Sequence, residues 1–472
     1  MMQKVLTKYW LTIHVGCVLF FPWLYLAQFH VPGLIPLLWL SLIALEVAVL
    51  LPSIRRGENF AEARMRVVRS LVSDPFLYLG FSVLAFVTVQ WLNSGCTLIY
   101  LPDANIWQFT TPNVPWAPFS VEPKPAQTNV SVFVACVVGC LCLRHAVSQV
   151  GKRLLLQTAV SISGVLASCS VWQACHGVEP YVGYAFGRTG CSLGAFFGFW
   201  LIIGMGVFAD TLARRRRGGE LYFLLGVVGN LVGALIFSKA WLLVSYAVIA
   251  FMLFFYWLWY LNALVPKHVQ LKLFLVSVVV IVGVVAALAF VFPGNPVAEK
   301  LKGTLPLEQY WHTLAETRQL RMTAALKIWQ EHPWTGVGAD GFHHFVGSVI
   351  GEKEWRLIKA DPSCVYNDCL QFLCEYGLLG LGLLLSAVGT LIVPVCFRAR
   401  NAWKNGSFED NENRIFLFRI SPLLLTGVIA TSICFLESWF GSPLRSPGML
   451  ISWIIVLSML PDFLPTSTRT TS

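Results

Sequence analysis

Arg318 and Arg321 are the residues of this sequence whose type and spacing first indicate chemistry. They lie three positions apart in a helical pattern that runs from 306 to 331 and is ended by Pro333, so their side chains share one face. An interfacial helix normally keeps cations off its apolar face. Here the same face carries Trp311, Leu314, Ala325, Ile328 and Trp329. We expect the guanidinium groups to point toward the body of the protein or toward lipid phosphates, with arginines that snorkel at a headgroup boundary as the alternative.

A glycine turn follows this helix. Gly336 and Gly338 stand at alternate positions in the sequence GVGADGF, which permits a tight turn whose backbone N–H groups are able to bind an anion such as phosphate. Turns of this composition are also common without any ligand. His343 and His344 come next, and an imidazole serves as acid or base near neutral pH, although loop histidines are often merely solvated.

A second polar face opens a predicted membrane span at 365–396. Asp368, Gln371 and Glu375 are three and four positions apart, so an acid, an amide and an acid share one helix face at the outer end of the span. Ionisable groups at membrane depth usually face a bundle interior or a wet cavity. Polar residues that seal contacts between helices are the alternative. The sequence GLLGLG at 377–382 predicts close packing of a neighbouring helix.

The composition predicts that these segments belong to an all-α polytopic membrane protein. Of 472 residues, 56% are hydrophobic and 12% are charged, whereas soluble domains carry roughly 25% charged residues. Runs of about 20 apolar residues recur along the whole chain. We predict one membrane domain, 1–472, with about twelve transmembrane helices and a long loop at 294–364 that contains the interfacial helix. The predicted spans are 9–29, 33–52, 70–94, 129–148, 154–174, 192–213, 220–237, 240–264, 273–293, 365–396, 416–437 and 446–463.

The distribution of basic residues predicts the orientation. Of the 34 Lys and Arg, 22 fall in segments predicted on the same side of the membrane as the N-terminus, and eight fall in the long loop on the other side. The other short segments hold four: Lys124, Arg188, Lys239 and Arg445. Because basic residues mark the cytoplasmic side, both termini are expected in the cytoplasm and 294–364 outside. The net charge of +10 therefore reflects topology and lipid contact and not nucleic acid, and each outer basic residue invites a functional explanation.

The chemistry-bearing segments resemble a known family. The sequence from Arg321, RMTAALKIWQEHPWTGVGADGF, and the sequence from Tyr366, YNDCLQFLCEYGLLGLG, resemble the signature region of the O-antigen ligase and O-antigen polymerase (Wzy-type) family over about 60 residues. There an Arg opens a helix, a Pro-x-x-Gly-x-Gly turn follows, and a His-Asn-x-x-Leu-Gln-x-x-x-Glu-x-Gly-x-x-Gly helix returns into the membrane. Upstream, FGRTGCSLGAF at 186–196 and SKAW at 238–241 are similar to two further family elements.

The resemblance implies a metal-independent glycosyltransferase that uses no cofactor. It would take a glycan from an undecaprenyl-diphosphate carrier and pass it to a hydroxyl of lipid A core, a growing polysaccharide or a protein, at the periplasmic face of the bacterial inner membrane. Membrane lipids are its other expected partners, and nucleic acid is not expected. Cations must hold the diphosphate leaving group, and a base must take the acceptor proton. The residues implied for the diphosphate are Arg188, Lys239, Arg318 and Arg321.

The catalytic assignment rests on fewer matches. Tyr366 stands where many members have the histidine proposed as base, so Asp368, His343 and His344 are the candidates to replace it, beside Tyr366 itself. Asp368 is preferred among them, because the motif helix fixes its position. Lys239 stands at the position of an arginine and lacks its bidentate fork. Other positions match the motif as it stands, namely Gly336, Gly338, Asn367, Gln371 and Glu375.

Two other classes of function compete with glycan transfer. A transporter or channel would line its path with buried charges and basic outer residues, but the sequence shows no inverted repeat and no paired broken helices. A non-catalytic relative of the ligase family is favoured by Tyr366 at the position of the base. Accumulation of undecaprenyl-linked glycan when the gene is deleted would discriminate these classes from a ligase or polymerase.

Overall fold

The computed structural model describes residues 2–24, 35–52, 58–95, 98–101, 106–109, 112–176, 190–214, 218–237, 307–358, 364–404 and 421–464. Within these residues almost all of the chain is helical, as its composition predicts. In this described part of the chain, six helices are long and apolar enough to cross a membrane, and four shorter helices are also apolar. The six are Pro75–Leu92, Pro123–His145, Gln149–Cys175, Leu193–Leu212, Gly219–Phe237 and Asp368–Asn401. The chain is therefore a helical membrane protein.

The first of two compact units contains Met1–Ser148, Glu308–Val393 and Leu436–Ser458. Its elements are α1 (Met2–Leu24), α2 (Ile35–Leu50), α3 (Phe60–Val72), α4 (Pro75–Leu92), β1 (Leu98–Leu101), β2 (Ile106–Phe109), α5 (Pro123–His145), α14 (Leu307–Glu331), α15 (Gly341–Val349), α16 (Glu352–Ile358), the first part of α17 (Asp368–Lys404), the 3-10 turn η3 (Pro443–Arg445) and most of α19 (Pro447–Met459).

The second unit contains Gln149–Leu307, Pro394–Phe435 and Met459–Ser472. Its elements are α6 (Gln149–Cys175), α8 (Gly190–Ala213), α9 (Gly219–Leu221), the π-helix η1 (Tyr222–Gly229), α10 (Asn230–Phe237), the end of α17, most of α18 (Pro422–Glu437) and the 3-10 turn η4 (Leu460–Phe463). Here η1 packs closely on its neighbours, because a side chain at Gly164 of α6 or at Gly204 of α8 would collide with the backbone of Leu225 or Gly226. Asn230 donates a hydrogen bond to Ser163 Oγ at 3.0 Å.

Every predicted span that falls on described residues coincides with a helix, although described ends differ from the predicted ones by up to eight residues, as at the end of α17. The boundaries follow from local chemistry. At the start of α4, Pro75 occupies the first turn and the Asp74 side chain accepts a hydrogen bond from the Phe76 N–H at 3.0 Å, which caps the helix. The predicted spans at 240–264 and 273–293 lie outside the described residues.

In the first unit, α5 forms the centre of the bundle. Helices α2 and α4 pack against it, and α1 packs against α2. Almost every residue of α5 from Val130 to Leu143 is buried, in keeping with the small and β-branched side chains of this segment. A helix that is apolar on all sides lies either in a protein interior or in lipid, and the burial of α5 puts it in the interior. Thus α5 is the central helix of the first unit.

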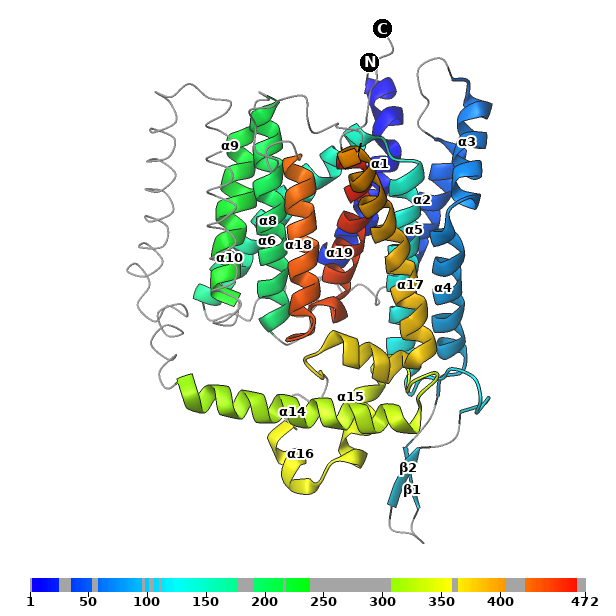
Figure 1. The fold of residues 1–472 in the computed structure, drawn as a ribbon, viewed down its shortest axis with the longest axis vertical. Helices are drawn as coiled ribbons and strands as arrows, with labels where there is room; N and C mark the ends of the chain where they lie inside the picture. The colour runs from blue at the N-terminus through cyan, green and yellow to red at the C-terminus, as the bar shows by residue number, and fades with distance from the viewer. Residues whose placement is uncertain are drawn as a thin grey trace. The chain divides into compact units, whose positions relative to one another are not determined.

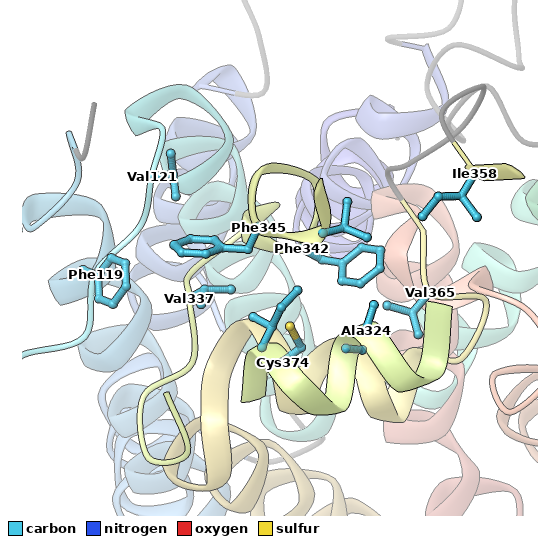
Figure 2. Close-up of a cluster of buried hydrophobic side chains, with 12 residues drawn as sticks. Phe119, Val121, Ala324, Val337, Phe342, Phe345, Ile358, Val365 and Cys374 are labelled. Atoms are coloured by element: carbon cyan, nitrogen blue, oxygen red, sulfur yellow. The ribbon is translucent and has the colours of Figure 1, made fainter. Parts of the chain in front are cut away.

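The segments of the predicted long loop lie at one end of this bundle. Helix α14 runs across that end, with α15 and α16 beside it, and the hairpin of β1 and β2 extends from the same end (Figure 1). A small apolar core holds these segments together, and Figure 2 shows its side chains gathered around α14 and α15. Its members are Phe119, Val121, Ala324, Ala325, Ile328, Val337, Phe342, Phe345, Val346, Ile358, Val365 and Cys374.

Helices α3, α15 and α16 and the strands β1 and β2 were not predicted from the sequence. Residues 60–72 form helix α3, begun by a capping box in which Asn59 Oδ1 accepts from the Glu62 N–H and Glu62 Oε2 accepts from the Asn59 N–H, at 2.9 and 3.0 Å. Strands β1 and β2 pair antiparallel, with Leu98 opposite Phe109. Within the described residues, this short hairpin contains the regular secondary structure that is not helical.

Candidate functional site

Helix α14 is confirmed from Leu307 to Glu331, and so is its buried stripe at the positions whose side chains the structure describes. Ala325 and Ile328 are fully buried in the apolar core, and the side chain of Arg321 is buried beside them at 6% exposure. Arg318 is half-buried and donates a hydrogen bond to the carbonyl of Phe440. Both arginines therefore point toward the body of the protein, the first of the two orientations that the sequence allowed.

Arg321 is held between two neighbours. Its Nη1 donates to the carbonyl oxygen of Cys364 at 2.7 Å, and its guanidinium lies over the ring of Tyr366 at 4.9 Å from the ring centre. Tyr366 has a φ of 59°, a left-handed conformation that is strained for an aromatic residue. A cation over an aromatic face is attracted to it, by more when both are shielded from water. Arg321 and Tyr366, distant in sequence, thus form one contact.

Helix α17 is broken at Gly377, where φ is 64° and ψ is −170°. A break normally leaves backbone groups without partners. Here the turn after α14 supplies them: the N–H groups of 337–338 donate to the carbonyls of 374–375 at 3.0 and 2.8 Å. Beyond the break, the N–H groups of 378–379 donate to the carbonyls of 333–334 at 2.9 and 3.1 Å. The turn after α14 and the break in α17 therefore satisfy each other's backbone hydrogen bonds.

The glycines of the motif are explained by this contact. A Cβ at Gly338, whose φ is 84°, would lie 2.3 Å from the carbonyl oxygen of Phe119, and one at Gly336 would lie 2.5 Å from the backbone of Glu375. The two glycines therefore allow the backbone of the turn to contact the backbones of Phe119 and Glu375 directly. Because the N–H groups of Val337 and Gly338 already donate to α17, these two amides are not available to an anion, which agrees with the alternative of a turn that binds no ligand there.

The polar face predicted for α17 is buried. Asp368 (2% exposed), Gln371 and Glu375 all lie in the interior, and Gln371 Nε2 donates to Glu375 Oε1 at 2.8 Å. Asn367 caps the helix by accepting from the Leu370 N–H at 3.0 Å. The Gln371 side-chain oxygen in turn accepts from the Val365 N–H at 3.1 Å. These contacts fix the entry of α17 beside the Arg321 and Tyr366 pair.

Two polar residues of the neighbouring spans join this region. Gln90 of α4 donates from Nε2 to the carbonyl of Glu375 at 3.1 Å, and Asn129 of α5 donates from Nδ2 to Tyr376 Oη at 2.7 Å. The sequence reasoning missed both. The signal was present, because a polar side chain inside an apolar span usually faces a partner in the bundle.

Arg445 is the other residue that the sequence reasoning did not assign to the site. It lies in η3 and forms an ion pair with Asp340, which has a φ of 59° in the turn before α15. Burial works against its charge, but Glu375, Cys364 and Asp340 raise the pKa of Arg445 above its ordinary value. Its signal in the sequence was its place among the few basic residues of the outer short segments.

The two predicted histidines follow Asp340 at the start of α15. His343 is exposed and His344 is half-buried on α15, with His344 Nε2 3.5 Å from a carboxylate oxygen of Glu122. His332, at the end of α14, packs between the rings of Phe119 and Phe345. Burial lowers the pKa of His332, although Glu331 opposes this shift.

The chemistry of the described site is that of a buried cation beside a polar helix entry. Arg321, Tyr366, Asp368, Gln371 and Glu375 are brought together around 364–375. Arg188 and Lys239 lie outside the described residues. Among the residues that the structure describes, no group of three or more His, Cys, Asp or Glu is arranged to hold a metal ion.

A scan of the chain against protein-family models finds no match, and a search of curated proteins finds none either. The function is therefore argued from the residues of the site.

Proposed function

We propose that the protein is a glycan ligase or polymerase of the O-antigen ligase type. It transfers a saccharide from an undecaprenyl-diphosphate carrier to a hydroxyl of lipid A core, a polysaccharide or a protein. The observation that carries the proposal is Arg321, a buried arginine on the apolar side of α14, held by the carbonyl of Cys364 and the ring of Tyr366. An arginine on an apolar face that only anchored the helix to headgroups would reach toward solvent instead.

The physical case rests on the leaving group. When the anomeric bond breaks, negative charge develops on the carrier diphosphate, and a preorganised cation in a poorly solvated place stabilises that charge. A guanidinium matches phosphate geometry through paired N–H donors, and its contacts with Cys364 and Tyr366 fix its orientation before substrate arrives. Arg318, Arg188 and Lys239 are the further cations proposed for the same diphosphate.

The acceptor hydroxyl needs a base, for which Asp368, His343, His344 and Tyr366 are the candidates. Asp368 Oδ2 accepts a hydrogen bond from the Leu444 N–H at 2.9 Å, which gives this carboxylate a role in holding α17. The Tyr366 ring is engaged by Arg321. His343 is exposed to solvent and His344 partly so, which favours the histidines as proton acceptors.

The base is tested with paired variants. In the double variant His343→Ala, His344→Ala, the transfer rate should fall by about 10²- to 10⁴-fold, because general base catalysis contributes on that order. Asp368→Asn keeps a side-chain oxygen that accepts from the Leu444 N–H but removes the negative charge. Because Asp368 has a role in holding α17, this change should lower the stability of the protein more than its transfer rate. The rate is measured per folded molecule with saturating carrier-linked glycan. Full activity in the histidine double variant, with loss in Asp368→Asn, would reverse the assignment.

The proposal places the protein in the bacterial inner membrane, with about twelve spans, both termini in the cytoplasm and 294–364 in the periplasm. The asymmetry of basic residues supports this orientation. Exposed aromatic side chains in the first unit support a membrane surface near α14, since Trp and Tyr gather at headgroup level. They are Trp116, Trp334, Trp439 and Phe440.

The deciding experiment uses purified full-length protein in vesicles with an undecaprenyl-diphosphate-linked glycan and a core lipid acceptor. Release of undecaprenyl diphosphate together with glycosylated acceptor supports the proposal. Tyr366 at the expected position of the base favours one second candidate, a non-catalytic protein that binds the same carrier lipid. Saturable binding of the carrier without release of undecaprenyl diphosphate, for every acceptor class, would favour that candidate over a transferase.

A further inference from the structure

The segment 438–446, between α18 and α19, binds the functional region at several points. Its backbone contacts come from residues at the entry of α17 and from α14. The Asp368 N–H donates to the Ser438 carbonyl at 2.7 Å, and the Leu444 N–H donates to Asp368 Oδ2 at 2.9 Å. The other contacts run from Asn367 Nδ2 to the Trp439 carbonyl and from Arg318 to the Phe440 carbonyl. The segment 438–446 therefore fixes the position of the entry of α17 and of the Arg318 side chain.

Arg445 contributes two side-chain contacts from this segment. Its Nη2 donates to Asp340 Oδ1, and its Nη1 donates to the sulfur of Cys364 at 3.7 Å. Asp340 is in the left-handed region of backbone conformation, which costs free energy unless other contacts maintain it. The ion pair with Arg445 is such a contact. Arg445 therefore joins the turn before α15 to Cys364, which precedes α17.

Cys364 is the point at which Arg445 and Arg321 meet. The carbonyl of this buried residue accepts from Arg321 Nη1 at 2.7 Å, and its thiol accepts from Arg445 Nη1. A displacement of Cys364 must therefore displace the acceptor that orients Arg321. Hydrogen bonds that share one residue transmit position in this way, because neither side chain relaxes without breaking its contact.

We propose that Arg445 is a positioning residue for Arg321: by binding Asp340 and the Cys364 thiol, it fixes the Cys364 carbonyl and with it the guanidinium that faces the carrier diphosphate. The inference rests on the proposed function for its catalytic consequence. Its structural part, that Arg445 immobilises Cys364, stands independently and is measured separately.

The first experiment measures alkylation of Cys364 in the full-length protein by a thiol reagent, quantified on its peptide by mass spectrometry. Arg445→Gln and Asp340→Asn should each raise the labelling rate on the order of tenfold, because local opening exposes the buried thiol. The double variant should label no faster than Arg445→Gln. Cys396, which is exposed on α17, serves as the internal reference. Unchanged labelling of Cys364 in Arg445→Gln would overturn the inference, whatever the protein catalyses.

The second experiment is a double-mutant cycle on glycan transfer. Arg445→Gln should lower kcat on the order of tenfold or more while the KM for the acceptor stays within about twofold, since positioning acts on the transition state. In an Arg321→Ala background the same change should have no further effect. Independent, multiplicative losses would overturn the inference, because Arg445 would then act without Arg321.

Two further variants control for the loss of any ion pair and for loss of the folded protein. Arg356→Gln removes an exposed ion pair with Glu352 on α16 and should change neither measurement. Arg445→Lys keeps the charge beside Asp340 and replaces Arg445→Gln in both experiments if the latter is not recovered as a monodisperse protein. If wild-type protein transfers no glycan, the proposed function fails, while the labelling of Cys364 still decides whether Arg445 holds this residue.

Discussion

Arg321 combines three properties in one side chain: burial, a fixed hydrogen-bond acceptor and an aromatic neighbour. Removal of such a residue from a structural site would mainly destabilise the fold. Removal from a site that stabilises developing charge would mainly reduce the rate. The two outcomes are separable, because the folded fraction and the rate per folded molecule are different measurements.

We expect Arg321→Ala to cost about 2 to 4 kcal/mol of transition-state stabilisation, as loss of one preorganised donor does. Arg321→Lys should retain charge but lose much of the activity, because an ammonium lacks the paired donors of a guanidinium. Lys327→Ala, on the exposed side of the same helix, is the matched control and should transfer glycan normally. Near-normal transfer by Arg321→Ala at equal protein level would show that this arginine only anchors α14.

His332 offers a prediction for pH dependence. Burial between Phe119 and Phe345 lowers the pKa of His332, so the unfolded chain binds its proton more readily than the folded one. The stability from neutral His332 is present above the ordinary histidine pKa of about 6.5 and is lost as pH falls through the lowered pKa. Wild-type protein should therefore lose more thermal stability than His332→Gln between about pH 7 and about pH 5. Parallel melting curves across this range would refute the expectation.

At the scale of the element, the break in α17 shows how a membrane helix interrupts its hydrogen bonds without leaving backbone groups unpaired. The turn at 333–338 supplies donors and acceptors on both sides of Gly377. Lipid provides no such partners, so a break is stable only where protein covers it. The turn at 333–338 is therefore required for the break in α17 to be stable.

Gly377→Ala should destabilise the protein by about 1 to 3 kcal/mol or more, since a left-handed backbone and a crowded Cβ act together. The added Cβ would lie 2.4 Å from the backbone of Trp334. Gly382→Ala is the matched control on the same helix, because no atom lies within 4 Å of its Cβ. That change should be neutral or stabilise by up to about 1 kcal/mol. Thermal unfolding in detergent measures both; equal midpoints would contradict the role of the break.

Local patterns predicted α14 almost to the residue, and they also predicted its buried arginine and the buried polar face of α17. Helical periodicity carries this information, because it depends on neighbours three and four positions away. The break at Gly377 was not predicted, since a glycine there also fits close helix packing, as Gly380 against Phe86 shows.

Contacts between distant segments were also missed. Asp340 and Arg445 are 105 positions apart, and no periodic pattern connects them. The ion pair forms because the chain before α19 lies in the first unit, beside the turn that contains Asp340. This placement is a property of the tertiary fold and is not encoded in the sequence around either residue. Gln90 and Asn129 were overlooked for the same reason, although each is a polar residue in an apolar span.

At the scale of the whole molecule, the basic residues predict an orientation on which the proposed function depends, because a periplasmic reaction requires the segments around α14 outside the cytoplasm. Twenty-two of the 34 Lys and Arg lie on one predicted side. The bias operates during insertion and applies to short loops. Orientation is therefore testable without any knowledge of the substrate.

A cysteine at Lys353 of α16 should react with a membrane-impermeant maleimide added to spheroplasts, whereas one at Lys404, at the end of α17, should react only after permeabilisation. Both native side chains are exposed, so access by reagent depends on the side of the membrane. The parent protein, labelled in parallel, gives the background from native cysteines. Labelling of position 404 but not 353 in intact spheroplasts would invert the topology.

The order of protein synthesis gives the segment 438–446 a further consequence. A ribosome translates this segment after every other described part of the site, so α14, the glycine turn and the entry of α17 emerge before Arg445 and Leu444 exist. Until then Asp340 and Asp368 lack the partners that these two residues provide. A chain that stalls or is cut before 438 would carry an unassembled site, so the carrier binding that we propose would begin only after this segment is made.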